Sequence, residues 1–317
     1  MARITTLIPT YRRPALLRRA LNSVLAQTFT DFEVQVWDNA SGDSTHAVVE
    51  EFMRRDSRVR YLCHPENVGM SPNHRIAAES VKTPLFNFLS DDDMLLPEFF
   101  ATAVKALERN PAAQFFIGLL LFANDDGAAL MAPLFPWRSG LYPPSALTRL
   151  ANAQTWMSMM FRSNVYSEVG GFDQRLDNAG DVDFLLRVLV KYSCVIDKTP
   201  CAVFSLHSGS NSTAGPRVNL ARDVLLTIGN VQRSSSIAAG VQKRIVEDLT
   251  RSYIRLGLEA ADLGQREAVM EVSRDLSGTL DRPIVGMLMR VMAGRSISSA
   301  LLKTTFRTLE GLRNRRR

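Results

Sequence analysis

Residues 87–100 read NFLSDDDMLLPEFF, an apolar run that ends in three consecutive carboxylates, Asp91, Asp92 and Asp93. The apolar residues before them have the composition of a buried strand. Three adjacent negative charges repel one another, so this is an unfavourable way to end a strand without positive partners. We therefore expect a cation or a set of hydrogen-bond donors opposite residues 91–93, which we call the acidic turn.

The acidic turn follows a regular alternation of strand-like and helix-like segments. Short β-branched or apolar runs, typical of strands, occur at residues 3–9, 32–38, 58–64 and 85–90. Between them, apolar side chains recur at helical spacing in residues 13–27, 44–55 and 71–80. Strands that alternate with helices at this pitch predict right-handed crossovers and a mostly parallel central sheet, covered on both faces.

Polar residues follow the ends of all four predicted strands. They are Thr10 and Tyr11, Asp38 and Asn39, residues 64–69, and the acidic turn. In an open parallel sheet, ligands bind beyond the carboxyl ends of the strands, where the strand order reverses. This edge of the sheet is therefore the predicted binding site.

The remainder of the chain departs from this alternation. The apolar run FFIGLLLFA at residues 115–123 predicts a buried strand or core segment, because it is far shorter than the roughly 20 residues that span a bilayer. Residues 112–213 mix short strands, proline-rich loops and a helix near DVDFLLRVLVKY, and residues 208–216 have the composition of a linker. Beyond them, helical periodicity continues, including residues 297–312.

These patterns predict an α/β fold with two domains. The first comprises residues 1–213, with a ligand-binding half at 1–97 and a second half at 98–213. The second domain, at residues 214–317, is a helical region that ends in a basic tail. Its helices could dimerise the protein, cover the second half of the site or lie on a membrane, and periodicity alone does not choose among these roles.

The composition of the chain is that of an ordinary globular protein, and its charge is concentrated near the end of the sequence. The hydrophobic content of 46% and charged content of 22% are ordinary for a globular protein. Residues 303–317 carry six basic residues against Glu310 alone, which suits anionic lipid headgroups or nucleic acid, or is simply a solvated terminus. Three cysteines without metal-ligand spacing, and no export signal at the start, predict a reduced cytoplasmic protein.

Common nucleotide-binding signatures are missing, since the sequence contains neither G-x-G-x-x-G after the first strand nor a P-loop. Instead, residues 7–45 (LIPTYRR…DNASGDST), 64–77 (HPENVGMSPNHRIA), the acidic turn and residues 160–188 occur in an order that resembles the family-two glycosyltransferases of the GT-A fold. The resemblance covers about two thirds of the chain and fades after FSLHSGSNS. It implies a nucleotide-sugar donor, most often a uridine diphosphate sugar, and Mn²⁺ or Mg²⁺ as cofactor.

The resemblance also implies roles for single residues of the nucleotide half. Pro9, Thr10 and Tyr11 would line the nucleotide pocket. Asp38 would accept a hydrogen bond from the base, although an aspartate after a strand also serves as a helix cap or turn residue. The expected contacts that remain are Asn67 and Gly69 in an N-x-G turn, and Arg75, for which a surface salt bridge is the alternative.

The acidic turn corresponds to the D-x-D element of the family, with Ser90 where many members have the first aspartate. Alignment on Pro97 makes Asp92 the favoured metal ligand and Asp91 the contact to ribose or to the metal's surroundings. Asp93 is either a further ligand or a structural partner. His207 resembles a position near the diphosphate or metal, with a purely structural histidine as the alternative.

The segment GGFDQRLDNAGDVDFLLRV at residues 170–188 would supply the general base. The family's usual glutamate is Gly180 here, which leaves Asp181 as the predicted base and Asp183 as the substitute; both could instead stabilise a helix start. Gly170 and Gly171 would form a tight turn near the sugar. Trp156 and Met157 would line the acceptor site or belong to the core.

The leading hypothesis is an inverting, metal-dependent hexosyltransferase that moves one sugar to a glycan or lipid-linked glycan, in polysaccharide synthesis at the inner face of the membrane. The polymerising members' Q-x-x-R-W element is absent, which favours transfer of a single sugar. The alternative is a non-catalytic nucleotide-sugar-binding module that recruits a partner enzyme. Nucleic-acid binding through RNRRR is less favoured, because the body of the chain lacks basic or aromatic stripes.

Overall fold

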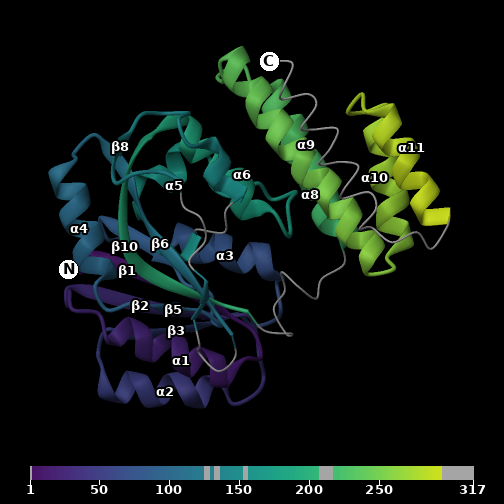
Figure 1. The fold of residues 1–317 in the computed structure, drawn as a ribbon. Coiled ribbons are helices and arrows are strands. Elements are labelled where there is room, and N and C mark those ends of the chain that lie inside the picture. Colours follow the sequence, from purple (N-terminus) through teal and green to yellow (C-terminus); the bar gives the residue numbers. More distant parts are fainter. Residues whose placement is uncertain (1, 125–128, 132–135, 153–155, 207–216, 295–317) are drawn as a thin grey trace. The chain divides into compact units, whose positions relative to one another are not determined.

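The computed structural model describes residues 2–124, 129–131, 136–152, 156–206 and 217–294 (Figure 1). The chain forms two units, one of Met1–Gln174 and Gly180–Ala214 and the other of Arg175–Ala179 and Gly215–Arg317. We call them the sheet unit and the helical unit. Within the described ranges, no helix combines the length and the hydrophobicity that crossing a membrane requires.

The first half of the sheet unit is the predicted alternation of strands and helices. In chain order its elements are β1 (Ile4–Thr10), α1 (Pro14–Leu25), β2 (Phe32–Asp38), α2 (Thr45–Arg55), β3 (Val59–Cys63), α3 (Met70–Glu79) and β4 (Leu85–Phe88). Every residue of β1 is buried, because the strand has neighbours on both edges and helices on both faces. In Figure 1, α1 and α2 cover one face of the sheet and α3 lies on the other.

In this half of the sheet the strand order is β3-β2-β1-β4. The pairs β1–β2, β2–β3 and β1–β4 are parallel, so the carboxyl ends of these strands meet at one edge. In this register Thr10, the last residue of β1, lies beside Asp38, the last residue of β2. The polar residues that follow the strands are thereby collected from separate parts of the chain.

The second half of the sheet unit is mixed in strand direction. Its elements are β5 (Met94–Leu95), α4 (Phe99–Arg109), β6 (Ala113–Ala123), β7 (Ala129–Met131), β8 (Gly140–Tyr142), two short 3₁₀ helices (Thr148–Asn152 and Trp156–Ser158), β9 (Met159–Arg162), α5 (Asn164–Glu168), α6 (Gly180–Lys191) and β10 (Ser193–Ser205). From β4 the strand order continues as β9-β6-β10-β5. β9 runs antiparallel to both β4 and β6, whereas β10 runs parallel to β6. The fully parallel part of the sheet is therefore limited to the first four strands. The predicted strand at residues 115–123 is confirmed as part of β6.

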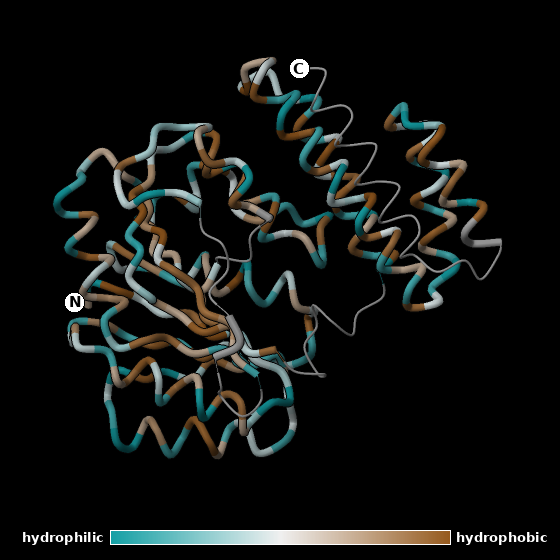
Figure 2. The backbone as a smooth tube through the Cα atoms, viewed as in Figure 1, coloured by the Kyte–Doolittle hydropathy of each residue, from teal (hydrophilic) through white to brown (hydrophobic). Residues whose placement is uncertain are grey.

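An aromatic cluster fills the space between β4, β9 and α6. The Trp156 ring stacks on Phe88 with centroids 4.6 Å apart and meets Phe161 and Phe184 at 6.2 and 6.0 Å. Trp156 and Met157 are 7% and 3% exposed, so both belong to the core. Figure 2 shows hydrophobic residues concentrated in the central strands, whereas hydrophobic and hydrophilic residues alternate along the helices.

The helical unit contains α8 (Arg217–Arg233), α9 (Ala239–Asp262), α10 (Arg266–Gly278) and α11 (Pro283–Gly294). Glycines allow these helices to approach closely: a Cβ at Gly286 would lie 2.2 Å from Ser277 Oγ, and one at Gly257 would lie 2.8 Å from Val272 Cγ1. The predicted helices within residues 217–278 are confirmed. The predicted linker at residues 208–216 and the predicted helix at 297–312 lie outside the described residues.

Candidate active site

The acidic turn lies at the edge where the parallel strands end, directly beyond β4. Its three aspartates are 5%, 8% and 1% exposed, so the charges that the sequence places together are also buried together. Thr10 Oγ1 donates a hydrogen bond of 2.8 Å to Asp91 Oδ2, which joins the end of β1 to the acidic turn. The sequence prediction that these segments share one edge is confirmed.

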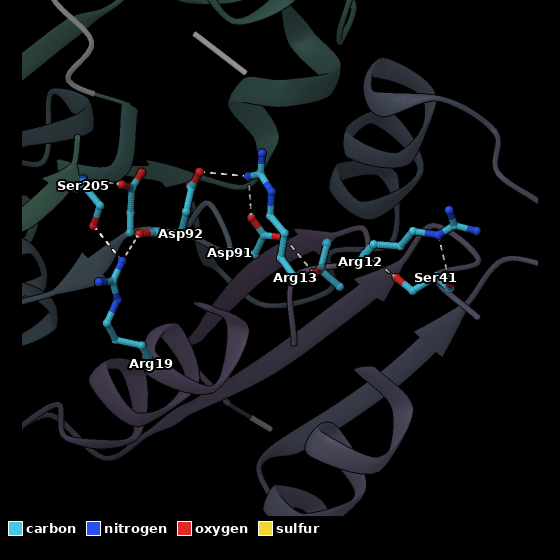
Figure 3. Close-up of polar contacts among 9 residues, drawn as sticks. Arg12, Arg13, Arg19, Ser41, Asp91, Asp92 and Ser205 are labelled. Atoms are coloured by element: carbon cyan, nitrogen blue, oxygen red, sulfur yellow. Dashed lines mark hydrogen bonds and ion pairs between the residues drawn. The ribbon is translucent and has the colours of Figure 1, made fainter. Parts of the chain in front are cut away.

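A guanidinium group lies opposite two of the three carboxylates (Figure 3). Arg13 Nη1, at the start of α1, lies 3.2 Å from Asp91 Oδ1 and 2.8 Å from Asp92 Oδ2. The side chain of Arg13 is 22% exposed, while those of Asp91 and Asp92 are 7% and 11% exposed. Arg13 is therefore a positive partner of the kind that the sequence led us to expect, and it belongs to the protein itself.

A second arginine fixes the backbone of the acidic turn. Arg19 Nη2 donates to the Asp92 carbonyl oxygen at 2.5 Å and to Ser205 Oγ at 2.8 Å. The Ser205 N–H donates to Asp93 Oδ1 at 2.8 Å, so the last residue of β10 also contacts the turn. Three segments, α1, the acidic turn and the end of β10, are thus tied together.

Burial perturbs the protonation of the acidic turn. It raises the pKa of Asp91 to about 6, an effect that the Arg13 guanidinium reduces. Burial, and then the charge of Asp92, raises the pKa of Asp93 to about 8. Asp93 Oδ2 is buried without a hydrogen-bond partner. A cation beside this oxygen would lower both pKa values and satisfy the oxygen.

The acidic turn fits a divalent cation. Mg²⁺ is typically held by one or two carboxylates together with substrate phosphates, so a complete protein cage is not required. Among the described residues, no three His, Cys, Asp or Glu side chains already form such a cage, since Asp91 and Asp92 face Arg13. The unpartnered oxygen of Asp93 and the neighbouring carboxylate of Asp92 are suitable hard ligands for Mn²⁺ or Mg²⁺. His207 lies outside the described residues.

Asp38 closes the turn after β2. Its Oδ1 accepts hydrogen bonds from the Ser41 N–H at 3.0 Å and the Ser41 hydroxyl at 2.6 Å, and its Oδ2 accepts from the Tyr61 hydroxyl at 2.5 Å. Burial and the bond to Asp38 raise the pKa of Tyr61 above its ordinary value. The turn role that the sequence left open for Asp38 is therefore present. Because a carboxylate offers about four acceptor positions, one remains available for a base.

The N-x-G turn precedes α3 and depends on Asn39, which the sequence placed at this edge of the sheet without giving it a role. Asn67 Oδ1 accepts from the Gly69 N–H and from Asn39 Nδ2, both at 2.9 Å. Asn39 Oδ1 accepts from the Val68 N–H at 2.8 Å, so it supports the turn from both sides. Gly69 has a φ of +92°, a conformation that favours glycine.

The remaining residues of the nucleotide half differ in their exposure. Pro9 is buried, whereas Tyr11 is 37% exposed at the same edge, with the Arg12 guanidinium 5.1 Å from its ring centroid. Arg75 forms an ion pair with Glu79, one turn along α3, at 3.2 Å. The surface salt bridge considered for Arg75 is therefore present. Both bonds to Glu79 come from Arg75 Nη1, so the other guanidinium nitrogens could contact a ligand while this pair is kept.

The start of α6 carries the candidate base. Asp181 is exposed in the first turn of the helix, and its Oδ1 accepts from the Val182 N–H at 2.8 Å. Asp183 is 3% exposed and bonds Arg187 Nε at 2.8 Å, an arrangement that suits a structural role. A Cβ at Gly180 would lie 3.9 Å from Ser71 Oγ, so the starts of α6 and α3 are neighbours. Asp181 is thus brought near the N-x-G turn.

The glycine pair before α6 forms the expected tight turn. Gly170 and Gly171 have φ values of +83° and +65°. A Cβ at Gly171 would lie 3.1 Å from the Tyr166 ring, so both conformation and space restrict this position to glycine. The backbone N–H of Phe172 donates to the Tyr166 hydroxyl at 3.3 Å, which anchors the end of the turn.

The chain matches a known protein family. The model of glycosyl transferase family 2 matches residues 5–165, about half of the chain and including β1 to β9. An uncharacterized protein of Mycobacterium tuberculosis is 26% identical over 200 residues, which are 59% of this chain and 62% of that protein. A Campylobacter jejuni protein named GalNAc(5)-diNAcBac-PP-undecaprenol beta-1,3-glucosyltransferase is 29% identical over 116 residues, which are 36% of this chain and 38% of that protein. The chain therefore spans less than two thirds of the length of either relative.

Solved structures share the fold at low sequence identity. S. aureus TarS 1–349 matches with a TM-score of 0.72 and 14% identity, over 96% of this chain and 92% of that chain. The same protein in complex with UDP-GlcNAc matches with a TM-score of 0.71 and 15% identity, over the same shares of the two chains. The mannosyltransferase PcManGT from Pyrobaculum calidifontis, in complex with GDP-Man and Mn²⁺, matches with a TM-score of 0.58 and 16% identity, over 94% of this chain and 86% of that chain. The predicted GT-A fold is thereby confirmed.

Proposed function

Because this chain belongs to glycosyl transferase family 2, we propose that it transfers one sugar from a nucleotide-diphosphate sugar to a glycan or lipid-linked glycan. The proposed reaction depends on a divalent cation and inverts the anomeric centre. The observation that carries the proposal is the acidic turn, three buried aspartates at the carboxyl-end edge of the sheet, tied to β1 through Thr10 and to α1 through Arg13.

In the proposed reaction, a hydroxyl oxygen of the acceptor attacks the anomeric carbon while the bond from that carbon to the diphosphate oxygen breaks. Asp181 accepts the proton of the attacking hydroxyl. Its exposed position at the start of α6 makes it accessible to an acceptor. Attack from the side opposite the diphosphate inverts the anomeric centre. A divalent cation held by Asp92 and Asp93 would neutralise the charge that develops on the departing diphosphate.

The nucleotide would bind along the edge formed by β1, β2 and the start of α3. Pro9, Thr10 and Tyr11 would line this pocket, Asp38 would accept a hydrogen bond from the base, and Asp91 would contact the ribose. The further nucleotide contacts proposed are Asn67, Gly69 and Arg75, and His207 is proposed as a metal ligand beside Asp92 and Asp93. Uridine is the favoured base, because TarS, which shares the fold, is known in complex with UDP-GlcNAc.

We propose a lipid-linked glycan acceptor and a position at the cytoplasmic face of the membrane. The name of the Campylobacter relative includes an undecaprenol-linked substrate. On α11, Ile284, Met287 and Val291 are 68%, 58% and 43% exposed and follow helical spacing, so one face of this helix is apolar and accessible. The six basic residues at 303–317 would add attraction to anionic lipids. A second copy of the chain is the other partner that this face could bind.

The test uses two conservative substitutions and one control. Asp92→Asn should abolish metal-dependent turnover, and Asp181→Asn should lower kcat by about 10²–10⁴-fold while donor binding is retained. Asp31→Asn, which changes an exposed carboxylate between α1 and β2, should retain full activity. Turnover would be measured with the donor found by screening nucleotide-sugars for thermal stabilisation, with and without Mn²⁺. Full activity in both Asp92→Asn and Asp181→Asn would contradict the assigned roles.

A non-catalytic nucleotide-sugar-binding module remains the second candidate, since Ser90 and Gly180 replace acidic residues that the family usually has. Space is available at position 180, where a Cβ would make only ordinary contacts at 3.9 Å, so glycine is not required there by packing. Calorimetric donor binding without turnover on any glycan would favour this candidate. Transfer that is lost in Asp181→Asn would exclude it.

A further inference from the structure

The segment that leads into α6 is held by a single buried carboxylate of the helical unit. The backbone N–H groups of Asp177, Asn178 and Ala179 donate to Asp223 Oδ2 at 3.0, 2.5 and 3.0 Å. Asp223 lies on α8 and is 7% exposed. Residues 175–179 belong to the helical unit, whereas the chain on both sides of them belongs to the sheet unit.

Three successive N–H groups that converge on one oxygen form an anion-binding concavity, here filled by the protein's own carboxylate. Burial raises the pKa of Asp223, and the three N–H bonds oppose that change by favouring the ionised form. A second contact lies two turns along the same helix, where Arg175 Nη2 donates to Asn230 Oδ1 at 2.9 Å. The segment is thus fixed to α8 at two points.

The fixed segment ends next to the candidate base. Ala179 carries the last of the three N–H groups, and Asp181 follows two residues later in the first turn of α6. Gly180 alone separates the fixed segment from Asp181, so a change in the backbone at Ala179 would reach the start of α6. A displacement of about 1 Å in a reacting group can lower the rate of transfer about 100-fold.

We propose that Asp223 is a positioning residue for the transfer reaction, which holds the backbone of residues 177–179 so that Asp181 is placed for proton abstraction. The inference rests on the proposed function of Asp181. In this inference Asp223 acts through the backbone of residues 177–179, which continues through Gly180 to Asp181. Donor binding depends on other elements, β1, β2 and the acidic turn, and is unaffected by Asp223.

The experiment compares Asp223→Ala, Asp223→Asn and the control Arg222→Ala. Arg222 is adjacent on α8, with a 59% exposed side chain that pairs with Glu271 at 2.7 Å. Asp223→Ala should lower kcat at least tenfold while the donor KM and the donor-induced rise in Tm stay within twofold. Asp223→Asn keeps an acceptor oxygen without the charge, so its kcat should be intermediate. Arg222→Ala should match the unmodified protein.

Hydrogen exchange and a double variant separate positioning from general stability. In Asp223→Ala, the amides of residues 177–179 should exchange faster, while those of β1 and β2 should not change. In the Asp181→Asn background, Asp223→Ala should produce no additional loss of kcat. Unchanged kcat despite faster exchange at 177–179, a parallel loss of donor binding, or an undiminished loss in the double variant would each overturn the inference. Full activity of Asp181→Asn alone would instead refute the proposed base.

Discussion

Replacing Arg13 with methionine should destabilise the sheet unit as long as no divalent cation is bound. Methionine keeps an apolar stem of similar length but leaves Asp91 and Asp92 without their guanidinium partner, which now lies 3.2 and 2.8 Å from them. Removing one member of a buried ion pair costs about 3–5 kcal/mol. Arg13 is about one-fifth exposed, and Asp91, whose pKa burial raises to about 6, can take up a proton. We therefore expect a loss of about 2–3 kcal/mol in the free energy of unfolding.

Tryptophan fluorescence measures this loss in the sheet unit alone. The three tryptophans of the chain, Trp37, Trp137 and Trp156, all lie within Met1–Gln174. Urea unfolding would be followed in EDTA and in excess Mg²⁺. A cation at about 100 times its dissociation constant stabilises the folded state by about 2.7 kcal/mol, so Mg²⁺ should restore most of the loss.

Arg18→Met is the matched control, because Arg18 lies one turn along the same helix. Its side chain is 42% exposed and pairs with Glu51, and exposed ion pairs of this kind contribute little to stability. The reasoning would be refuted if the two variants lost equal stability in EDTA. It would also be refuted if Mg²⁺ left the loss in Arg13→Met unchanged.

Three other predictions concern pH, thiol reactivity and helix packing. In the metal-free protein, the free energy of unfolding should fall as the pH rises from about 4 to about 8, because burial raises the folded-state pKa of Asp93 above its unfolded value. Urea unfolding at several pH values measures this dependence, and Asp93→Asn should flatten it. A thiol reagent should label only Cys63 in the native protein and all three cysteines after unfolding, because the other two are buried and burial raises their pKa values. Gly286→Ala should lower the free energy of unfolding by about 1–3 kcal/mol, and with it the Tm measured by circular dichroism, because the new Cβ would meet Ser277 Oγ. Gly278→Ala is the control and should leave the Tm unchanged, because the space around Gly278 is open.

The first four strands and the three helices between them could be predicted because their signals are local. Each strand is a short apolar run and each helix has apolar residues at helical spacing, and crossover geometry then fixes the parallel order. The direction of β9 carries no such signal. Its four residues, MMFR, would fit a parallel or an antiparallel neighbour, and the connections around them decide the direction.

The candidate site could be predicted only in part, because some of its contacts join residues that are distant in sequence. The acidic turn and Asp38 were located because they follow recognisable strands. The partners of the acidic turn were not, because they are distant in sequence: Arg13 lies 78 residues from Asp91, and Ser205 lies 112 residues from Asp93. Only the need for a positive charge could be inferred, and both a metal ion and an arginine satisfy it. The support that Asn39 gives to the N-x-G turn likewise depends on the register of β2 and β3.

The irregularity in β10 determines where insertions and deletions can occur in this protein. Pairing with β6 is interrupted between Ile196 and Pro200, where Asp197 Oδ1 accepts from the Thr199 N–H at 2.9 Å. One residue gained or lost after Pro200 would invert the alternation of the strand and turn the Ser205 N–H away from Asp93. The same change at residues 197–199 would alter only a short loop. During evolution, changes of length in this strand can therefore accumulate at residues 197–199, while the end of β10 keeps its register with β6 and its contact with Asp93.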